Sequence, residues 1–298
     1  MQTKTPKQKI HIPVLLQEVV DTLKPKNGET YLDLTAGYGG HSGEILNKTG
    51  YSTNSVLVDR DTRAIDTLKD LFGSKVTLLH SDFFTASKTL AEQGKTFDLI
   101  LADLGVSSPH LDTASRGFSI QKDGPLDMRM DQTAALSARD IVNSYSSQQL
   151  QTLLRVYGEE PKAKKIAELI IANRPIETTH QLAEIVAQAW PGYSKLHPAT
   201  RTFQALRIAV NDELQQVQAS LPIWETLLAP GGRLAVITFH SLEDRIVKRY
   251  FREHTDSYDA SLTDLTHRPL TAGPNELLIN PRARSAKLRA VAKIKTKG

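Results

Sequence analysis

Residues 31–42 read YLDLTAGYGGHS, and this stretch decides the fold because it joins a short apolar run to a glycine-rich turn. Gly37, Gly39 and Gly40 let the backbone turn tightly and come close to a ligand. A helix that begins near His41 would point its free N–H groups at the same place. A tight turn with a purely structural role is the alternative for this motif alone.

The charge of this turn separates two kinds of cofactor. Asp33 ends the apolar run where it would repel a pyrophosphate, and the order of the glycines differs from the G-x-G-x-x-G pattern of dinucleotide sites. S-adenosylmethionine carries an ammonium and a sulfonium group and no phosphate, so a nearby carboxylate favours its binding. The sequence therefore favours S-adenosylmethionine. A nicotinamide-dependent oxidoreductase is the rival, and a binding assay with both cofactors would decide between them.

Four further apolar runs extend the pattern of strand followed by helix. With the first run, they cover residues 30–34, 55–58, 76–80, 97–103 and 233–239. Such alternation is typical of a parallel sheet that helices cover on both faces. The 129 residues between the fourth and fifth runs exceed the roughly 30 that a strand–helix–strand unit needs. We therefore predict a helical domain inserted between these two strands.

Capping residues and periodicity place several helices and the last strands. Ser146 or Ser147 would cap a helix that stops near Gly158. A further helix is predicted from Ser241 to about Arg252, followed by a polar stretch over 253–265 and by strands near 268–271 and 286–294. One face of a single helix is predicted to carry Phe203, Leu206, Val210, Leu214 and Val217.

The ends of the second and third strands carry residues suited to a nucleoside. Asp59 can accept hydrogen bonds from both ribose hydroxyls, and Asp61 is expected to cap the next helix. Asp82 could accept from the adenine amino group, and Phe83 could stack on the ring. Taken alone, Phe83 is more often a core aromatic residue, so that alternative stays open.

The fourth strand opens into the turn Asp103–His110, which reads DLGVSSPH. An exocyclic amine is a poor nucleophile, and acceptors that bind its hydrogens can aim its lone pair at a methyl group. The candidates for this catalytic role are Asp103, Ser108 and Pro109, whereas His110 stands where amino-methylating enzymes carry an aromatic residue. A Ser-Ser-Pro turn that merely ends the strand is the alternative.

Two more segments have both a functional and a structural interpretation. The segment 116–131 contains Phe118, Leu126 and two of the three methionines among charged residues, which suggests a lid over the substrate or burial against the inserted helices. His240 lies at the ligand end of the fifth strand and suits a pocket or a packed position. Ser241 and Asp244 are predicted to form a capping box.

The composition excludes several kinds of chemistry. The 298 residues include no cysteine, which excludes disulfides, thiolate catalysis, Fe–S clusters and cysteine-bound zinc. The nine histidines lack H-E-x-x-H spacing, so we predict no zinc site and name no metal ligand, whereas an all-oxygen magnesium site stays open. No run of about 18 apolar residues and no apolar signal segment occurs, so we expect a cytoplasmic protein that does not span a membrane.

Positive charge gathers at the two ends of the chain. Residues 1–10 contain three Lys, and residues 282–298 contain seven Lys or Arg, with no acidic residue in either segment. The remaining 27 basic groups face 33 acidic ones, so the ends account for the net charge of +4. Basic ends suit a polyphosphate partner such as a nucleic acid, and solvated tails are the alternative.

Together, these motifs resemble the ribosomal RNA small subunit methyltransferase H family of bacteria (MraW type). The matching segments follow one another in order along almost the whole chain. They are 11–15 (HIPVL), 35–42, 103–109, 116–131, 197–205 (HPATRTFQA), 239–245 and 280–285 (NPRARS).

The resemblance implies a substrate, a cofactor and a set of contacts. It implies N4-methylation of one cytidine in the decoding centre (P site) of 16S rRNA, with S-adenosylmethionine as donor. Carried over by position, the cofactor contacts are Gly39, Gly40, His41, Asp59, Phe83, Asp103 and His110. A cofactor role for Asp103 competes with its role toward the amine, and Leu34 stands where a small residue is expected.

We therefore predict an α/β fold with a class I, Rossmann-like methyltransferase core and an inserted all-helical domain. The core comprises residues 1–111 and 213–298, and the inserted domain comprises residues 112–212. The inserted domain is expected to hold 16S rRNA with Arg201, Arg207 and the basic C-terminal segment, and a homodimer stays open. One alternative is an amino-methyltransferase that acts on DNA or on another RNA, although we expect no DNA partner. The other is a non-catalytic ribosome-assembly factor that binds S-adenosylmethionine.

Overall fold

The computed structural model describes residues 13–52, 54–105, 111–192 and 197–295. The chain divides into two compact units: unit 1 comprises residues 1–104 and 217–298, and unit 2 comprises residues 105–216. No helix in the described ranges is both long and apolar enough to cross a membrane.

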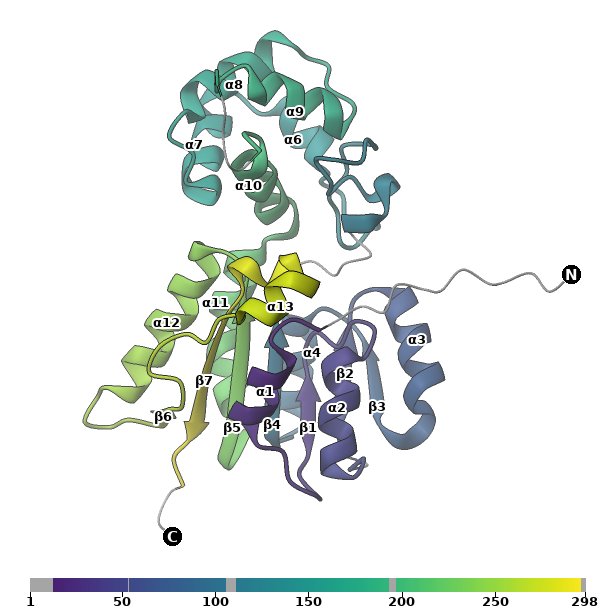
Figure 1. The fold of residues 1–298 in the computed structure, drawn as a ribbon, viewed down its shortest axis with the longest axis vertical. Coiled ribbons are helices and arrows are strands. Elements are labelled where there is room, and N and C mark those ends of the chain that lie inside the picture. Colours follow the sequence, from purple (N-terminus) through teal and green to yellow (C-terminus); the bar gives the residue numbers. More distant parts are fainter. Residues whose placement is uncertain (1–12, 53, 106–110, 193–196, 296–298) are drawn as a thin grey trace, which may run out of the picture. The chain divides into compact units, whose positions relative to one another are not determined.

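Unit 1 is built on a seven-stranded sheet in the order β3-β2-β1-β4-β5-β7-β6 (Figure 1). The first five strands in this order are parallel, and β7 pairs antiparallel with both β5 and β6. This strand order, with an antiparallel strand inserted near one edge, is the class I methyltransferase fold, so the predicted fold class is confirmed. The strands are β1 (Tyr31–Asp33), β2 (Val56–Asp59), β3 (Thr77–His80), β4 (Phe97–Asp103), β5 (Leu228–Thr238), β6 (Leu262–Asp264) and β7 (Lys287–Lys293).

Helices cover both faces of this sheet, because alternate strand residues point to opposite sides. Leu99 and Leu101 of β4 belong to one apolar cluster, and Ile100 and Ala102 belong to the other. The first cluster includes residues of α1 (Leu16–Leu23), α2 (Gly40–Thr49) and α3 (Thr62–Phe72). The second includes residues of α4 (Phe83–Glu92), α11 (Glu213–Thr226) and α12 (Ser241–Thr255). Burial on both faces explains why the strands read as continuous apolar runs.

The end of the chain differs from the sequence prediction in two ways. The predicted strand at 268–271 is wrong, because this segment makes only an isolated bridge between Leu270 and Leu288. A strand instead occurs at β6, within the stretch predicted to be polar, where Leu262 is buried and its two neighbours are not. Short helices, α13 (Pro274–Ile279) and the 3-10 turn at Pro281–Ser285, precede β7.

The basic segment 287–293 is not a solvated tail, because it forms β7 inside the sheet. Lys287 and Arg289 both bind the carboxylate of Asp244 on α12, at 3.0 and 2.7 Å. The Lys293 ammonium donates to the main-chain carbonyls of Glu225 and Leu228. Lys287, Arg289 and Lys293 are therefore engaged within the fold.

Unit 2 is helical and has an apolar cluster of its own. Its helices are α6 (Ala138–Ser144), α7 (Ser147–Gly158), α8 (Ala163–Ala172), α9 (Thr179–Ala187) and α10 (Thr200–Asn211). Capping boxes begin three of them, with Ser137, Ser146 and Thr178 as the first residues of the boxes. The predicted single apolar face over 203–217 is wrong beyond Val210, because Asp212, at a φ of 49°, separates α10 from α11.

The segment 116–131 packs into the core of unit 2, so the lid interpretation is wrong. Phe118, Leu126 and Met130 are at most 6% exposed and belong to the same cluster as the helices. The Asn211 side chain accepts from the main-chain N–H of Met130, and the Arg116 guanidinium donates to the Met130 carbonyl. These bonds satisfy the backbone N–H and C=O of Met130, and Asp127 pairs with Arg129 within the loop.

Candidate cofactor site and active site

The carboxyl ends of β1 to β4 lie at one edge of the sheet, where open parallel sheets of this type bind their ligands. Asp59 at the end of β2 pairs in register with His80 at the end of β3. Asp33 ends β1 and Asp103 ends the neighbouring β4. The three strand-end carboxylates predicted from the sequence, Asp33, Asp59 and Asp103, therefore end adjacent strands at the same edge of the sheet.

The turn between β1 and α2 forms a cradle that only glycine fits. Gly39, at a φ of 80°, caps α2, and a Cβ atom there would lie 3.0 Å from the Phe72 ring. At Gly40 a Cβ atom would overlap the ring of Pro13. The Gly37 N–H donates to Asp59 Oδ2 at 2.8 Å, so the turn is fastened to the end of β2. The first turn of a helix has N–H groups without an acceptor inside the helix, so such a turn suits a polar ligand.

Asp33 fixes the conformation of this turn through hydrogen bonds. It is 1% exposed and accepts hydrogen bonds from the Tyr31 hydroxyl (2.7 Å), the Ser42 hydroxyl (2.6 Å) and the Thr35 N–H (3.1 Å). Burial raises the pKa of Asp33 to about 6, although the three hydrogen bonds oppose this rise. Asp33 therefore positions the turn rather than facing a ligand, and its partners Tyr31 and Ser42 were missed from the sequence.

Asp103 is the carboxyl group with unused binding capacity. Within the described residues its Oδ1 atom is buried and has no hydrogen-bond partner. Its Oδ2 atom lies 3.9 Å from His41 Nδ1, while His41 Nε2 lies 2.9 Å from the Val14 carbonyl. Burial, followed by the nearby charges of Asp33 and Glu243, raises the pKa of Asp103 well above its ordinary value. A bound ammonium group would supply the missing donor and favour the ionised form.

Asp59 keeps capacity for a ribose. Its two oxygens accept from the N–H groups of Gly37 and Asp61, each at 2.8 Å, and each oxygen retains a second lone pair. The carboxyl group is mostly buried, and this burial raises its pKa. Asp61 caps α3 by accepting from the Arg63 N–H, which confirms its predicted structural role.

Phe83 begins α4 next to the end of β3 and has a half-buried ring. The ring meets Trp224 edge-to-face, with 5.8 Å between the ring centroids, and Trp224 donates to Ser87 at 2.9 Å. Asp82 caps α4 by accepting from the Thr85 N–H through one oxygen. Phe83 is thus fixed from the core side by Trp224, a supporting residue that the sequence did not reveal.

His240 is the first residue of the capping box of α12, so the predicted box of Ser241 and Asp244 is wrong. The Glu243 N–H donates to His240 Nδ1, and Glu243 Oε2 accepts from the His240 N–H. Asp244 instead pairs with the two basic residues of β7. Of the remaining predicted site residues, Ser108, Pro109 and His110 lie outside the described residues.

The comparisons with known proteins cover nearly all of this chain. The model of the MraW methylase family matches residues 8–294. A protein of Acidobacterium capsulatum named ribosomal RNA small subunit methyltransferase H is 46% identical over 294 residues, which cover 95% of this chain and 98% of that protein. Proteins of the same name from Trichlorobacter lovleyi and Synechococcus elongatus are 47% and 46% identical, each over 95% of this chain and over 98% and 95% of their own lengths.

Proposed function

The chain belongs to the MraW methylase family, and we propose that it methylates N4 of one cytidine in the decoding centre of 16S rRNA. It is an S-adenosylmethionine-dependent methyltransferase, as the family and the fold indicate. The observation that carries the proposal is the meeting of a glycine cradle and two carboxyl groups with spare acceptor sites at one sheet edge. We propose that the reaction takes place in the cytoplasm. A chain without cysteine forms no disulfides, and this suits a reducing compartment.

Each proposed cofactor residue would contact a different part of S-adenosylmethionine. Gly39, Gly40 and His41 would border the methionine part through the first turn of α2, and Asp59 would accept from the ribose hydroxyls. Phe83 would flank the adenine, and the free Oδ1 of Asp103 would accept from the ammonium. His110 completes the proposed set by position. When bound, S-adenosylmethionine supplies an electrophilic methyl group next to these strand ends.

The catalytic role is to orient the cytosine amine. Its lone pair is delocalised into the ring, so acceptors for its hydrogens must aim the nitrogen at the methyl carbon. We assign this role to Asp103 with Ser108 and Pro109, the last through its main-chain carbonyl. If Asp103 binds the cofactor ammonium, the amine falls to Ser108 and Pro109. The two assignments differ in whether the Asp103→Asn variant loses affinity for the cofactor or only turnover.

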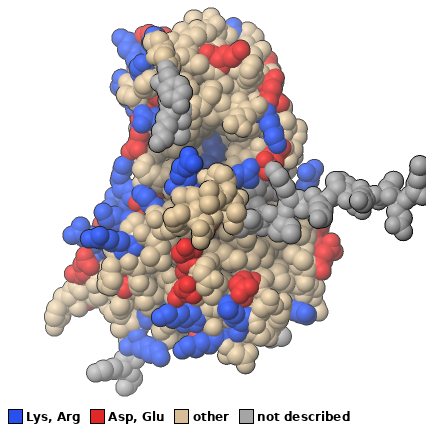
Figure 2. All heavy atoms as spheres, viewed as in Figure 1, with Lys and Arg blue, Asp and Glu red and all other residues tan. Residues whose placement is uncertain are grey.

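Unit 2 is the proposed substrate-recognition domain. Arg201 is exposed at the start of α10 and suits a phosphate contact. Arg207 does not suit one, because its guanidinium forms a bidentate pair with Glu213 at 2.8 and 2.9 Å and is 16% exposed. Unit 1 offers a further basic surface on α12, where Arg245, Lys248, Arg249 and Arg252 are exposed (Figure 2).

The test is methyl transfer into small ribosomal subunits purified from cells that lack this enzyme. Labelled S-adenosylmethionine should place one label in 16S rRNA, and nucleoside analysis should recover it as N4-methylcytidine. Label on a carbon atom, on adenosine or in DNA would contradict the assignment. Tight cofactor binding with no transfer to any nucleic acid would identify a non-catalytic assembly factor instead.

A further inference from the structure

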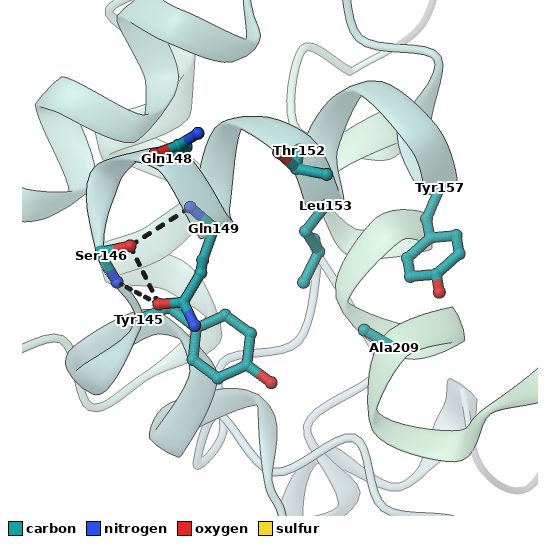
Figure 3. Close-up of a pocket in the computed structure, with 8 residues that line it drawn as sticks. All are labelled: Tyr145, Ser146, Gln148, Gln149, Thr152, Leu153, Tyr157 and Ala209. Carbon is teal, nitrogen blue, oxygen red and sulfur yellow. Dashed lines mark hydrogen bonds between the residues drawn. The ribbon is translucent and has the colours of Figure 1, made fainter.

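Unit 2 contains a pocket of about 510 Å³ at its surface, between α7 and α10 (Figure 3). A volume of this size is in the usual range for small-molecule sites. The residues that decide its chemistry are Tyr145, Ser146, Gln149, Thr152, Tyr157 and Ala209. Two aromatic rings lie on its wall, and the small Ala209 side chain leaves its α10 side open.

The residues that line the pocket favour an uncharged, planar ligand with hydrogen-bonding groups at its edge. None of the described residues that line the pocket is charged, so neither a phosphate nor a carboxylate would find a counter-charge inside it. Tyrosine rings offer stacking faces, while amide and hydroxyl groups offer hydrogen bonds at the edge of a ring. Unpaired nucleobases are recognised in proteins by this combination.

The polar groups of the pocket are held ready for a ligand. Gln149 Oε1 accepts from the Ser146 N–H (2.8 Å) and hydroxyl (2.9 Å), which fixes the amide and leaves its NH₂ group available. Among the described residues, the phenol oxygens of Tyr145 and Tyr157 have no hydrogen-bond partner. The pocket therefore offers one amide donor and two phenol groups. Because the Gln149 amide is already held in place, binding a ligand costs no further side-chain entropy there.

The helix beyond the pocket continues the same surface. Arg155 is exposed and lies three residues after Thr152, hence on the same face of α7. It would meet the phosphate backbone of a strand whose base enters the pocket. Val156, four residues after Thr152, is 53% exposed and adds apolar surface at the rim.

We propose that this pocket binds an unpaired nucleobase of the substrate RNA other than the base that is methylated. The inference rests on the proposed function for the identity of the RNA. All lining residues belong to unit 2, and none comes from the strand ends of unit 1 that would hold the cofactor. None of them is a residue proposed to orient the reacting amine either, so we assign the pocket to anchoring the substrate strand.

The first experiment measures methyl transfer to unmethylated small subunits by the full-length protein. Tyr145→Ala removes a stacking face, and Ala209→Trp fills the pocket from α10. Each is expected to raise the KM for the subunit about tenfold, the size of one lost base–aromatic contact, and to leave kcat and the Kd for S-adenosylmethionine unchanged. The control is Tyr258→Ala, a fully exposed tyrosine of unit 1, which should change neither constant.

Two results of this experiment overturn the proposal. An unchanged KM in both variants, with circular dichroism and cofactor affinity as in the wild type, shows that no base is held there. A fall in kcat with an unchanged KM assigns the pocket to the target base, which contradicts the anchoring role.

The second experiment measures binding without methylation, so that the two proposals can fail separately. Full-length protein is titrated into a fluorescein-labelled single-stranded RNA oligonucleotide and into an abasic strand of the same length. Ala209→Trp should weaken binding of the normal strand about tenfold and leave binding of the abasic strand unchanged. If this difference appears while the wild type methylates no rRNA, only the proposed function fails. Equal effects on both strands, or a loss seen only with intact subunits, overturn the nucleobase site.

Discussion

Asp33 shows how a single residue can both hold a site and cost the fold stability. Its folded pKa, about 6, exceeds that of an unfolded aspartate, about 4. Between these values the native chain binds more protons than the unfolded chain. The contribution of Asp33 to the free energy of unfolding is therefore fully present below about pH 4 and is lost as the pH rises through about 6.

Replacing Asp33 with Asn should remove this pH-dependent component. The difference in the free energy of unfolding between Asp33→Asn and the wild type is expected to shift by about 3 kcal/mol in favour of the variant between pH 4 and pH 7. Urea denaturation across this range measures it. Asp66→Asn, at an exposed carboxylate of α3, is the matched control for the loss of a carboxylate at the surface. A constant difference for Asp33→Asn would mean that its carboxyl group titrates normally.

The Gly39 position separates backbone strain from steric overlap. Gly39→Ala combines a φ of 80° with a contact to Phe72, whereas Gly94→Ala combines a φ of 66° with open space around the new Cβ. Both substitutions should lower the free energy of unfolding by about 1–2 kcal/mol from strain alone. Only Gly39→Ala should also weaken the binding of S-adenosylmethionine, by at least tenfold in calorimetry. Wild-type affinity in Gly39→Ala would refute the cradle.

At the scale of elements, Asp244 fastens α12 to β7. Its carboxyl group is 8% exposed; burial raises its pKa, but the hydrogen bonds from Arg289 and Lys287 outweigh this and lower it overall. The stability that it contributes is therefore present above about pH 4 and lost at lower pH. This pairing was not predictable, because 45 residues separate Asp244 from Arg289 and only the strand insertion brings them together.

Asp244→Asn should lower the free energy of unfolding by about 3 kcal/mol at pH 7, because it leaves two basic groups without their counter-charge. The matched control is Asp256→Asn at the C-cap of the same helix, which breaks an exposed pair with Arg252 and should cost less than about 1 kcal/mol. Chemical denaturation at pH 7 and pH 3 compares the two. Equal costs for both variants would show that β7 is not held through this carboxylate.

Helix starts show where local sequence rules succeed and fail. Ser146 and Asp61 act as caps as their residue types predict, because the capping bond is formed within three residues. At α12 the box begins one residue earlier, at His240, a residue type that local rules do not favour. Asp244 was free to pair elsewhere because Glu243 already completes the box. The box formed by His240 and Glu243 therefore leaves Asp244 to pair with β7, whereas the predicted box of Ser241 and Asp244 would have used this carboxylate locally.

The whole molecule has separate apolar cores in its two units, and this predicts two unfolding transitions. Leu126→Ala should lower the midpoint of one transition by several degrees, because the side chain is 1% exposed in the core of unit 2. S-adenosylmethionine should raise mainly the other transition, since all of its proposed contacts except His110 belong to unit 1. Differential scanning calorimetry with and without cofactor checks both. A single transition that shifts in every case would argue against independent cores.

The sequence predicted most of the sheet because buried parallel strands carry continuous apolar runs. It also predicted Asp59 as a strand-end residue, whereas the ligand role of the site residues stays a prediction. For 116–131 the sequence left a lid and burial as alternatives, because the charged residues Asp127 and Arg129 stand among the apolar ones; in the structure these two pair with each other. The pocket on α7 and α10 was equally hidden, since its residues come from segments more than 50 positions apart.

The position of β7 has a consequence for synthesis of the protein. Among the described residues, β6 pairs with β7 alone and β7 alone covers one edge of β5, so the sheet stays open until residues 287–293 are made. A nascent chain still attached at its C-terminus would carry an exposed strand edge, which invites association with other chains. Unit 2, whose residues emerge much earlier, can assemble its core during translation. Synthesis of β7 is then the step that completes the sheet of unit 1.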